Sequence, residues 1–107
     1  MPLPNPVTPV EWVSIEIIRQ IFKESGFYEA ILSGKFFQWI KRSSHPNPPP
    51  DGEPFCTHSQ IAYYYNSNGE PVAVVHQYLR PDGSIGASGL PDPKRLILQD
   101  RIVAVRS

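Results

Sequence analysis

The residues of this chain best suited to chemistry lie on either side of one glycine-rich segment, residues 81–93. His76, Tyr78 and Arg80 alternate in the run before it, so in a β-strand they would share one face. Lys94 follows the segment directly. Imidazole can move a proton near neutral pH, and guanidinium or ammonium groups can bind a phosphate. The pattern therefore fits a metal-independent ribonuclease site with His76 as acid or base, Arg80 and Lys94 as phosphate ligands and Tyr78 as a positioning group.

The same residues also fit a purely structural role, because one histidine and one arginine on a strand are common and structural networks resemble sites. The chain has ten basic and ten acidic residues, and this balance weakens the case for a nucleic-acid partner. No other catalytic motif is present. We therefore expect a small non-catalytic binding module that presents residues 81–93. A ribonuclease-like enzyme and a domain that binds a small molecule between sheet and loop are the alternatives.

Residues 81–93 are long enough to be a binding loop, since connections in compact domains are usually about 4–6 residues. Their glycines recur every third residue and would let backbone N–H groups approach an anion. The segment is not a nucleotide fingerprint, because neither Lys-Ser/Thr nor a helix follows the glycines. A chain of turns is the other interpretation. The candidate binding residues are Gly83, Ser84, Gly86, Ser88, Gly89 and Arg95.

Four residues are of the types that bind zinc, namely His45, Cys56, His58 and His76. Structural zinc sites usually draw their ligands from closely spaced pairs, and only Cys56 and His58 form such a pair. We expect no metal and no cofactor.

Whether His58 and His76 can act together depends on the turn between their strands. If Asn68-Gly69 forms a two-residue turn, His58 points to the opposite face from His76 and lies beside Leu79. A three-residue loop with a glycine bulge would bring the two histidines to one face. Asn-Gly favours the two-residue turn.

Two helices are expected to come first. Thr8-Pro9-Val10-Glu11 has the pattern of a capping box with proline at the first helical position, and apolar residues then recur at helical spacing until Ser25-Gly26. Residues 27–33 predict a second, shorter helix. Residues 35–42 fit a helix and a strand about equally.

Beyond a proline-rich connector at 45–54, the apolar period changes to two, which indicates strands. Tyr63-Tyr64-Tyr65 places rings on both faces of one strand, which fits a stacking platform for bases, an interface, or core on one side. The fold class is therefore α+β, with two N-terminal helices packed on a C-terminal antiparallel sheet of 3–5 strands. We expect residues 1–7 to form an extended proline-rich arm and residues 8–107 a single domain. The expected strands are 57–65, 71–80, 95–99 and 101–105.

We expect no secretory signal from the residues at the N-terminus, and the sequence contains no apolar run of the roughly 20 residues that a membrane span needs. Its single cysteine cannot form an intramolecular disulfide. We expect a soluble cytoplasmic protein without a membrane partner. The open edges of a small sheet and a wide apolar helix face predict a homodimer.

The run HQYLRPDGSIGASGLPDPKR, from His76 to Arg95, resembles the C-terminal part of small bacterial proteins of uncharacterised function. The resemblance implies a bacterial protein and no particular activity. In outline, two helices followed by an antiparallel sheet are also similar to the small metal-independent ribonucleases of toxin systems. That likeness concerns the fold, which does not fix function.

Overall fold

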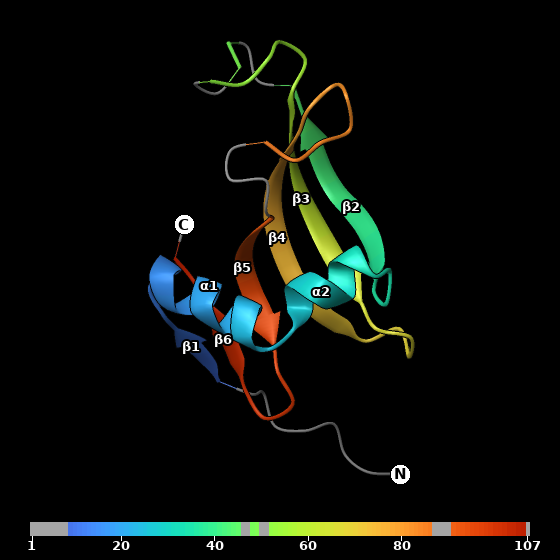
Figure 1. Cartoon of the computed structure of the whole chain (residues 1–107). Helices are drawn as coiled ribbons and strands as arrows, with labels where there is room; N and C mark the ends of the chain where they lie inside the picture. Colours follow the sequence, from blue (N-terminus) through green and yellow to red (C-terminus); the bar gives the residue numbers. More distant parts are fainter. Residues whose placement is uncertain (1–8, 46–47, 50–51, 87–90, 107) are drawn as a thin grey trace.

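The protein has two layers, a six-stranded sheet and two helices that lie against one face of it (Figure 1). The computed structural model describes residues 9–45, 48–49, 52–86 and 91–106. The predicted α+β class is confirmed. In chain order the elements are β1 (Val10–Trp12), α1 (Ile15–Glu24), α2 (Phe27–Leu32), β2 (Phe37–Ser44), β3 (His58–Tyr65), β4 (Pro71–Leu79), β5 (Asp92–Ile97) and β6 (Ile102–Ala104).

The sheet differs from the prediction in size and in type. Its order is β1-β6-β5-β4-β3-β2, and β1 pairs with β6 in parallel whereas all other neighbours are antiparallel. The expected antiparallel sheet of 3–5 strands is therefore wrong. Two segments account for the difference, because the start of the expected first helix is β1 and the ambiguous residues 35–42 fall largely in β2.

Helix α1 begins later than its apparent capping box suggests. Ser14 is the N-cap, and its hydroxyl accepts a hydrogen bond from the backbone N–H of Ile17 at 3.2 Å. Val10 and Trp12 instead pair with β6, which suits β-branched and aromatic side chains. Thr8 lies outside the described residues. The predicted end of the helix is confirmed, since Ser25 is the C-cap and Gly26 follows with φ 76°.

The hairpin of β3 and β4 combines a three-residue loop with a bulge. The backbone N–H of Asn66 donates to the carbonyl of Glu70, and Gly69 lies at φ 78°, so the predicted two-residue turn is wrong. Tyr65 therefore lies opposite Pro71, but Tyr64 lies opposite Ala73, which leaves Val72 as an extra residue in β4. Proline has no N–H to give to the ladder and is accommodated at such bulges.

This bulge restores the pairing that the two-residue turn predicted. His58 lies opposite Leu79 and Ile61 lies opposite His76. Since side chains alternate along a strand, His58 and His76 are on opposite faces of the sheet. A joint site for these two histidines is excluded by the register.

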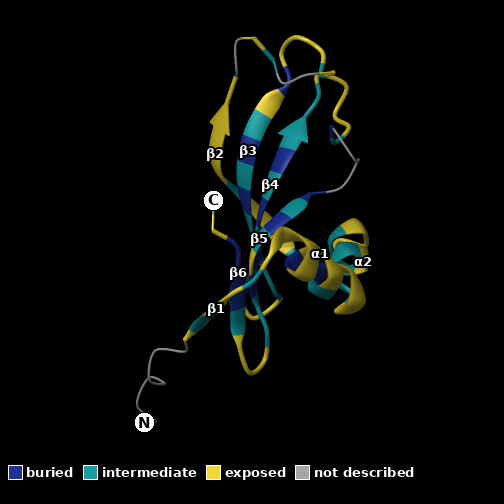
Figure 2. Ribbon diagram, turned by 90° about the vertical axis from the view of Figure 1, so that its left-hand side faces the viewer, coloured by how far each residue is buried: buried dark blue, intermediate teal, exposed yellow. Residues whose placement is uncertain are grey.

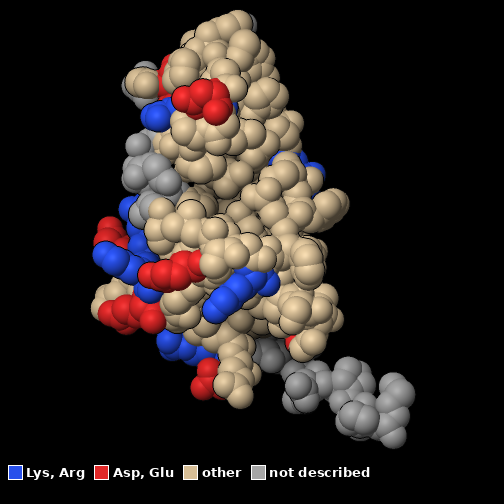
Figure 3. Space-filling model, turned by 45° about the vertical axis from the view of Figure 1, so that its right-hand side comes forward, with Lys and Arg blue, Asp and Glu red and all other residues tan. Residues whose placement is uncertain are grey.

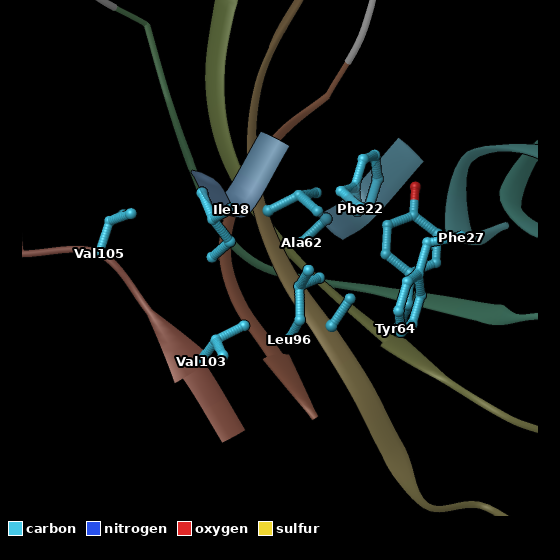
Figure 4. Packing of buried hydrophobic residues seen from close by; sticks show 10 residues of the cluster. Ile18, Phe22, Phe27, Ala62, Tyr64, Leu96, Val103 and Val105 are labelled. Carbon is cyan, nitrogen blue, oxygen red and sulfur yellow. The ribbon is translucent and has the colours of Figure 1, made fainter. Parts of the chain in front are cut away.

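The hydrophobic core lies between α1, α2 and the sheet (Figure 4). Ile18 and Phe22 point from α1 toward the sheet and are almost fully buried, with Leu96 of β5 and Val103 of β6 among the core side chains they join. The ring of Phe22 is stacked with that of Phe27, with centroids 5.9 Å apart, which ties α2 to α1.

The two faces of the sheet are covered unequally. We call the face against α1 and α2 the helix face and the other the open face. Figure 2 shows both helices together on one side of the sheet. Alternate residues of β3 and β4 are accordingly buried on the helix face and half-buried on the open face. No helix of the described chain is long and apolar enough to cross a membrane.

The described start of the segment after β4, residues 80–86, folds back as a tight turn. Ile85 forms a β-bridge with Leu79, and the N–H of Gly86 donates to the carbonyl of Tyr78 at 2.7 Å. At the other end β5 already begins at Asp92, so the expected strand 95–99 starts too late. Residues 87–90, with Ser88 and Gly89 among them, lie outside the described residues.

The cap of α1 gives a direct test of where the helix starts. Replacing Ser14 by Ala removes the acceptor for the Ile17 N–H, and we expect the free energy of unfolding to fall by about 1 kcal/mol. Ser14→Gly should cost only a few tenths of that value, because glycine at an N-cap leaves the backbone groups open to water. Urea denaturation of the two variants measures both values, and no loss for Ser14→Ala would show that the helix starts elsewhere.

Candidate functional site

His76 sits on the open face in a small polar cluster. Its Nε2 atom lies 2.7 Å from the hydroxyl of Ser59 on β3, and its ring meets that of Tyr78 edge-on with centroids 4.7 Å apart. Burial lowers the pKa of His76 below the usual value of histidine, the charge of Lys94 lowers it further, and Asp92 opposes both. The imidazole is therefore mainly neutral at pH 7. Among the candidate catalytic residues, His76, Tyr78 and Lys94 are thus brought together.

Asp92, which the sequence did not single out, organises the charges beside His76. It lies opposite His76 in the ladder, and its carboxylate binds Arg19 of α1 at 2.9 Å and Lys94 at 3.2 Å. Burial raises the pKa of Asp92, but the hydrogen bonds and charges of Arg19 and Lys94 outweigh it and hold that pKa below its usual value. Lys94 is therefore already bound to a carboxylate.

Arg80, the second candidate phosphate ligand, also binds a carboxylate. Its guanidinium contacts both oxygens of Glu53, with distances of 2.8 Å and 3.2 Å. The side chain of Glu53 is only 4% exposed, whereas that of Arg80 is 33% exposed. Glu53 comes from the segment before β3, so this ion pair joins that segment to the end of β4.

The glycines and serine of the turn have local structural roles. Gly83 lies at φ 89°, and the Asp82 carboxylate accepts hydrogen bonds from the backbone N–H and the hydroxyl of Ser84. These bonds hold the pKa of Asp82 below its usual value. At Gly86 a Cβ atom would lie 2.7 Å from the Glu53 oxygens, so glycine leaves the room that this carboxylate occupies. Arg95, the remaining candidate, is exposed opposite Val74.

The residues of zinc-binding type do not come together. The rings of His45 and His58 are stacked with centroids 5.4 Å apart, and His58 Nδ1 lies 3.1 Å from the hydroxyl of Ser43. Cys56 is exposed, and His76 is on the other face of the sheet. Within the described residues, no group of three or more histidine, cysteine or acidic residues could hold a metal ion.

A pocket of about 330 Å³ lies on the helix face, between α2 and the turn that follows β4. It therefore lies between the sheet and the segment from which the sequence predicted binding. Figure 3 shows charged side chains gathered over α1 and few over the surface above it. None of the lining side chains is charged; they are Tyr28, Ile31, Leu32, Gln38, Ile40, Gln60, Tyr64, Gln77, Leu79, Gly83, Ile85 and Pro91.

The polar groups of this pocket come from three adjacent strands. Gln77 donates through Nε2 to Gln60 Oε1 at 2.9 Å, and Gln60 donates to the Ser43 hydroxyl at 3.3 Å. Gln38 donates to the hydroxyl of Tyr64 at 2.8 Å. Burial raises the pKa of Tyr64, which keeps its hydroxyl neutral, and the bond from Gln38 opposes this only in part. The four side chains form an amide and phenol floor among mainly aliphatic walls.

Sequence reasoning did not select this floor, although a signal for it was present. Gln60 belongs to the same every-second-residue series of β3 as Ala62 and Tyr64, and Gln77 follows Val75 in the corresponding series of β4; both series face the core. A glutamine in such a buried series needs a partner or a ligand. The register expected from a two-residue turn already places Gln60 opposite Gln77, and the structure reaches the same pairing through the bulge at Val72.

Comparison with models of protein families, with curated proteins and with solved structures gave no match to this chain. The candidate sites therefore rest on the geometry described above.

Gly86→Ala tests the contact between the turn and Glu53. The added methyl group would meet the carboxylate at 2.7 Å, and we expect overpacking of this kind to lower the free energy of unfolding by about 1–3 kcal/mol. Chemical denaturation of Gly86→Ala and Glu53→Ala, singly and together, measures the coupling. Gly86→Ala should lower the free energy of unfolding less when Glu53 is already replaced by Ala. An equal loss with and without Glu53 would contradict this contact.

The lowered pKa of His76 makes stability depend on pH. Below 6.5, the unperturbed value, the unfolded chain binds a proton at this residue that the folded protein takes up only at lower pH. The free energy of unfolding should therefore fall on acidification below 6.5, and it should fall less steeply in His76→Gln. Urea denaturation across a pH series measures both slopes. Equal slopes would show that burial of the imidazole does not act on stability.

Proposed function

We propose that this protein is a non-catalytic binding module that holds an uncharged ligand in the pocket between α2 and the turn after β4. The observation that carries the proposal is the hydrogen-bonded floor of Gln38, Gln60, Gln77 and Tyr64 within walls that are mainly aliphatic, with Tyr28 of α2 among them. Ligand sites typically combine mainly apolar walls with a few placed polar groups, over about 300–1,000 Å³. The pocket is of this kind and lies near the lower limit of size.

The pocket's chemistry narrows the class of ligand. A charged group would be desolvated there without an opposite charge among the lining side chains, which is unfavourable. Amide groups pair with both donors and acceptors, so a ligand with an amide-like edge would match the floor. The aliphatic side chains of Ile31, Ile40 and Ile85 suit a flat apolar body. We therefore expect a small uncharged heterocycle or amide, of which a nucleobase is an example.

The ribonuclease alternative receives less support from the geometry. Arg80 is bound to the nearly buried Glu53, and Lys94 is bound to Asp92. A phosphate would have to displace these carboxylates, and leaving Glu53 without its cation would be costly. His76 retains a neutral imidazole suited to proton transfer, but its Nε2 is engaged by Ser59.

A binding experiment with matched charged and uncharged compounds tests the proposal. We would record thermal shifts and ¹H–¹⁵N spectra with nucleobases, nucleosides and small amides, and with the corresponding nucleoside monophosphates. An uncharged compound should raise the melting temperature and move the side-chain NH₂ signals of Gln60 and Gln77. Nucleoside monophosphates should raise the melting temperature less and move these signals less, because no cation lines the pocket to bind their phosphate.

Gln77→Leu should abolish that shift, while Gln99→Leu in the exposed turn after β5 should leave it intact. If no uncharged compound moves the Gln60 and Gln77 signals, or if Gln77→Leu binds as well as the unaltered protein, the pocket is not a ligand site.

A further inference from the structure

The open face of the sheet is a second surface with a distinct composition. Trp39 is 54% exposed, Phe37 64% and Trp12 49%, although large aromatic side chains are normally buried. Trp39 lies opposite Tyr63 and Phe37 opposite Tyr65, so their side chains share the open face. The rings of Trp39 and Tyr63 meet edge-on with centroids 5.8 Å apart. The strands β2 and β3 thus display a row of aromatic rings.

Positive charges accompany these rings. Lys41 lies over the ring of Tyr63, with its Nζ atom 5.1 Å from the centroid, and Arg106 lies over that of Trp12 at 4.5 Å. By register Arg42 and Arg95 belong to the same face, opposite Ile61 and Val74. Lys41 and Arg42 belong to the edge strand β2, Arg95 belongs to β5, and Arg106 lies over Trp12 of the other edge strand, β1.

The matching acidic residues are elsewhere. Among the described strand residues that the register assigns to the open face, the acid is Asp92, and Arg19 and Lys94 already bind it. Other acids lie on α1 and α2 or at hairpin turns, for example Glu16, Glu29 and Glu70. The zero net charge of the chain therefore hides a segregation of charge, with an excess of cations on the open face.

We infer that the open face binds single-stranded nucleic acid. Unpaired bases can stack on exposed aromatic rings irrespective of sequence, and neighbouring lysine and arginine side chains can bind the phosphates. Trp39 and Phe37 offer rings for stacking, and Lys41 and Arg42 lie beside them on the same strand. A duplex would offer its phosphates but not the faces of its bases, so the rings would gain little from it.

The charge of the open face favours a polyanion over a second copy of this chain. In a two-fold dimer the same patch lies on both subunits, so this face would oppose its own cations. Like charges across an interface destabilise it. The open face and the pocket share no residue, since Gln60, Tyr64 and Gln77 face the helices. The proposal that the open face binds nucleic acid can therefore be tested separately from the proposal of a ligand in the pocket.

The experiment uses a fluorescein-labelled oligouridylate, its oligothymidylate equivalent and a duplex of the same length. Both tryptophans of the chain lie on the open face, so stacking should quench intrinsic fluorescence as anisotropy of the label rises. The binding constant should fall with salt, with a log–log slope of about −0.7 for each phosphate that a cation neutralises. The duplex should bind more weakly and without quenching.

Matched variants locate the binding surface. Trp39→Ala should weaken binding of the oligouridylate about fivefold or more, whereas Ile17→Ala, 45% exposed on α1, should not. Arg42→Glu should reduce the salt slope, whereas Lys23→Glu on α1 should leave it unchanged. Circular dichroism checks that each variant is folded.

Three outcomes would overturn the inference. Equal binding of duplex and single strand without quenching would show only non-specific attraction. Equal effects of Lys23→Glu and Arg42→Glu would place binding elsewhere. Absence of binding at low salt would exclude nucleic acid, and sedimentation of a dimer that Trp39→Ala dissociates would then identify the open face as a self-association surface.

Discussion

The extra residue that β4 carries at Val72 decides what each face of the sheet presents. The loop at Ser67-Asn68-Gly69 starts the hairpin in one register, and the bulge beside Pro71 shifts it by one residue. Without that shift every side chain of β3 would face a different partner on β4. Pro71 lies next to this bulge, where its lack of an N–H is tolerated because the regular ladder is already interrupted.

The two faces then acquire different chemistry from one pair of strands. Toward the helices the hairpin supplies Gln60, Gln77 and Tyr64, whose polar groups are bonded to one another or to β2. Toward the open side it supplies Tyr63, Tyr65 and His76. Helices α1 and α2 complete the core over β5 and part of β3 and β4 but leave the pocket beyond α2. Compact helices and a long sheet thus create a concave site on one side and a broad uncovered surface on the other.

Local sequence signals predicted those parts of the fold that local energetics control. Gly26 ends α1 because it accepts a positive φ, and residues 27–33 contain α2. The start of α1 was misplaced because Val10 and Trp12 are fixed by β6, more than ninety positions away, against a plausible local cap. The same competition decided residues 35–42, whose aromatic side chains pair with β3.

The candidate site was predicted least well where it depends on distant charges. Arg80 and Lys94 have the right types and positions for phosphate binding, but Glu53 and Asp92 bind them. Nothing in the spacing of Glu53 indicates that its carboxylate reaches the end of β4. The open face was missed for a related reason. The net charge of the chain is zero because acids and bases are equal in number, but the register places Arg42 and Arg95 on one face and most acids elsewhere.

Cross-strand nuclear Overhauser effects between β3 and β4 test the register most directly, because the amide floor and the face that Arg95 shares with the aromatic row depend on it. The account predicts contacts between Ile61 and His76 and between the side chains of Gln60 and Gln77, with the Trp39 indole close to the Tyr63 ring. Contacts that instead pair His58 with Tyr78 and Gln60 with His76 would show that the strands lack the shift at Val72. In that case the amide floor would not exist as described, and Arg95 of β5 would not share a face with the aromatic row.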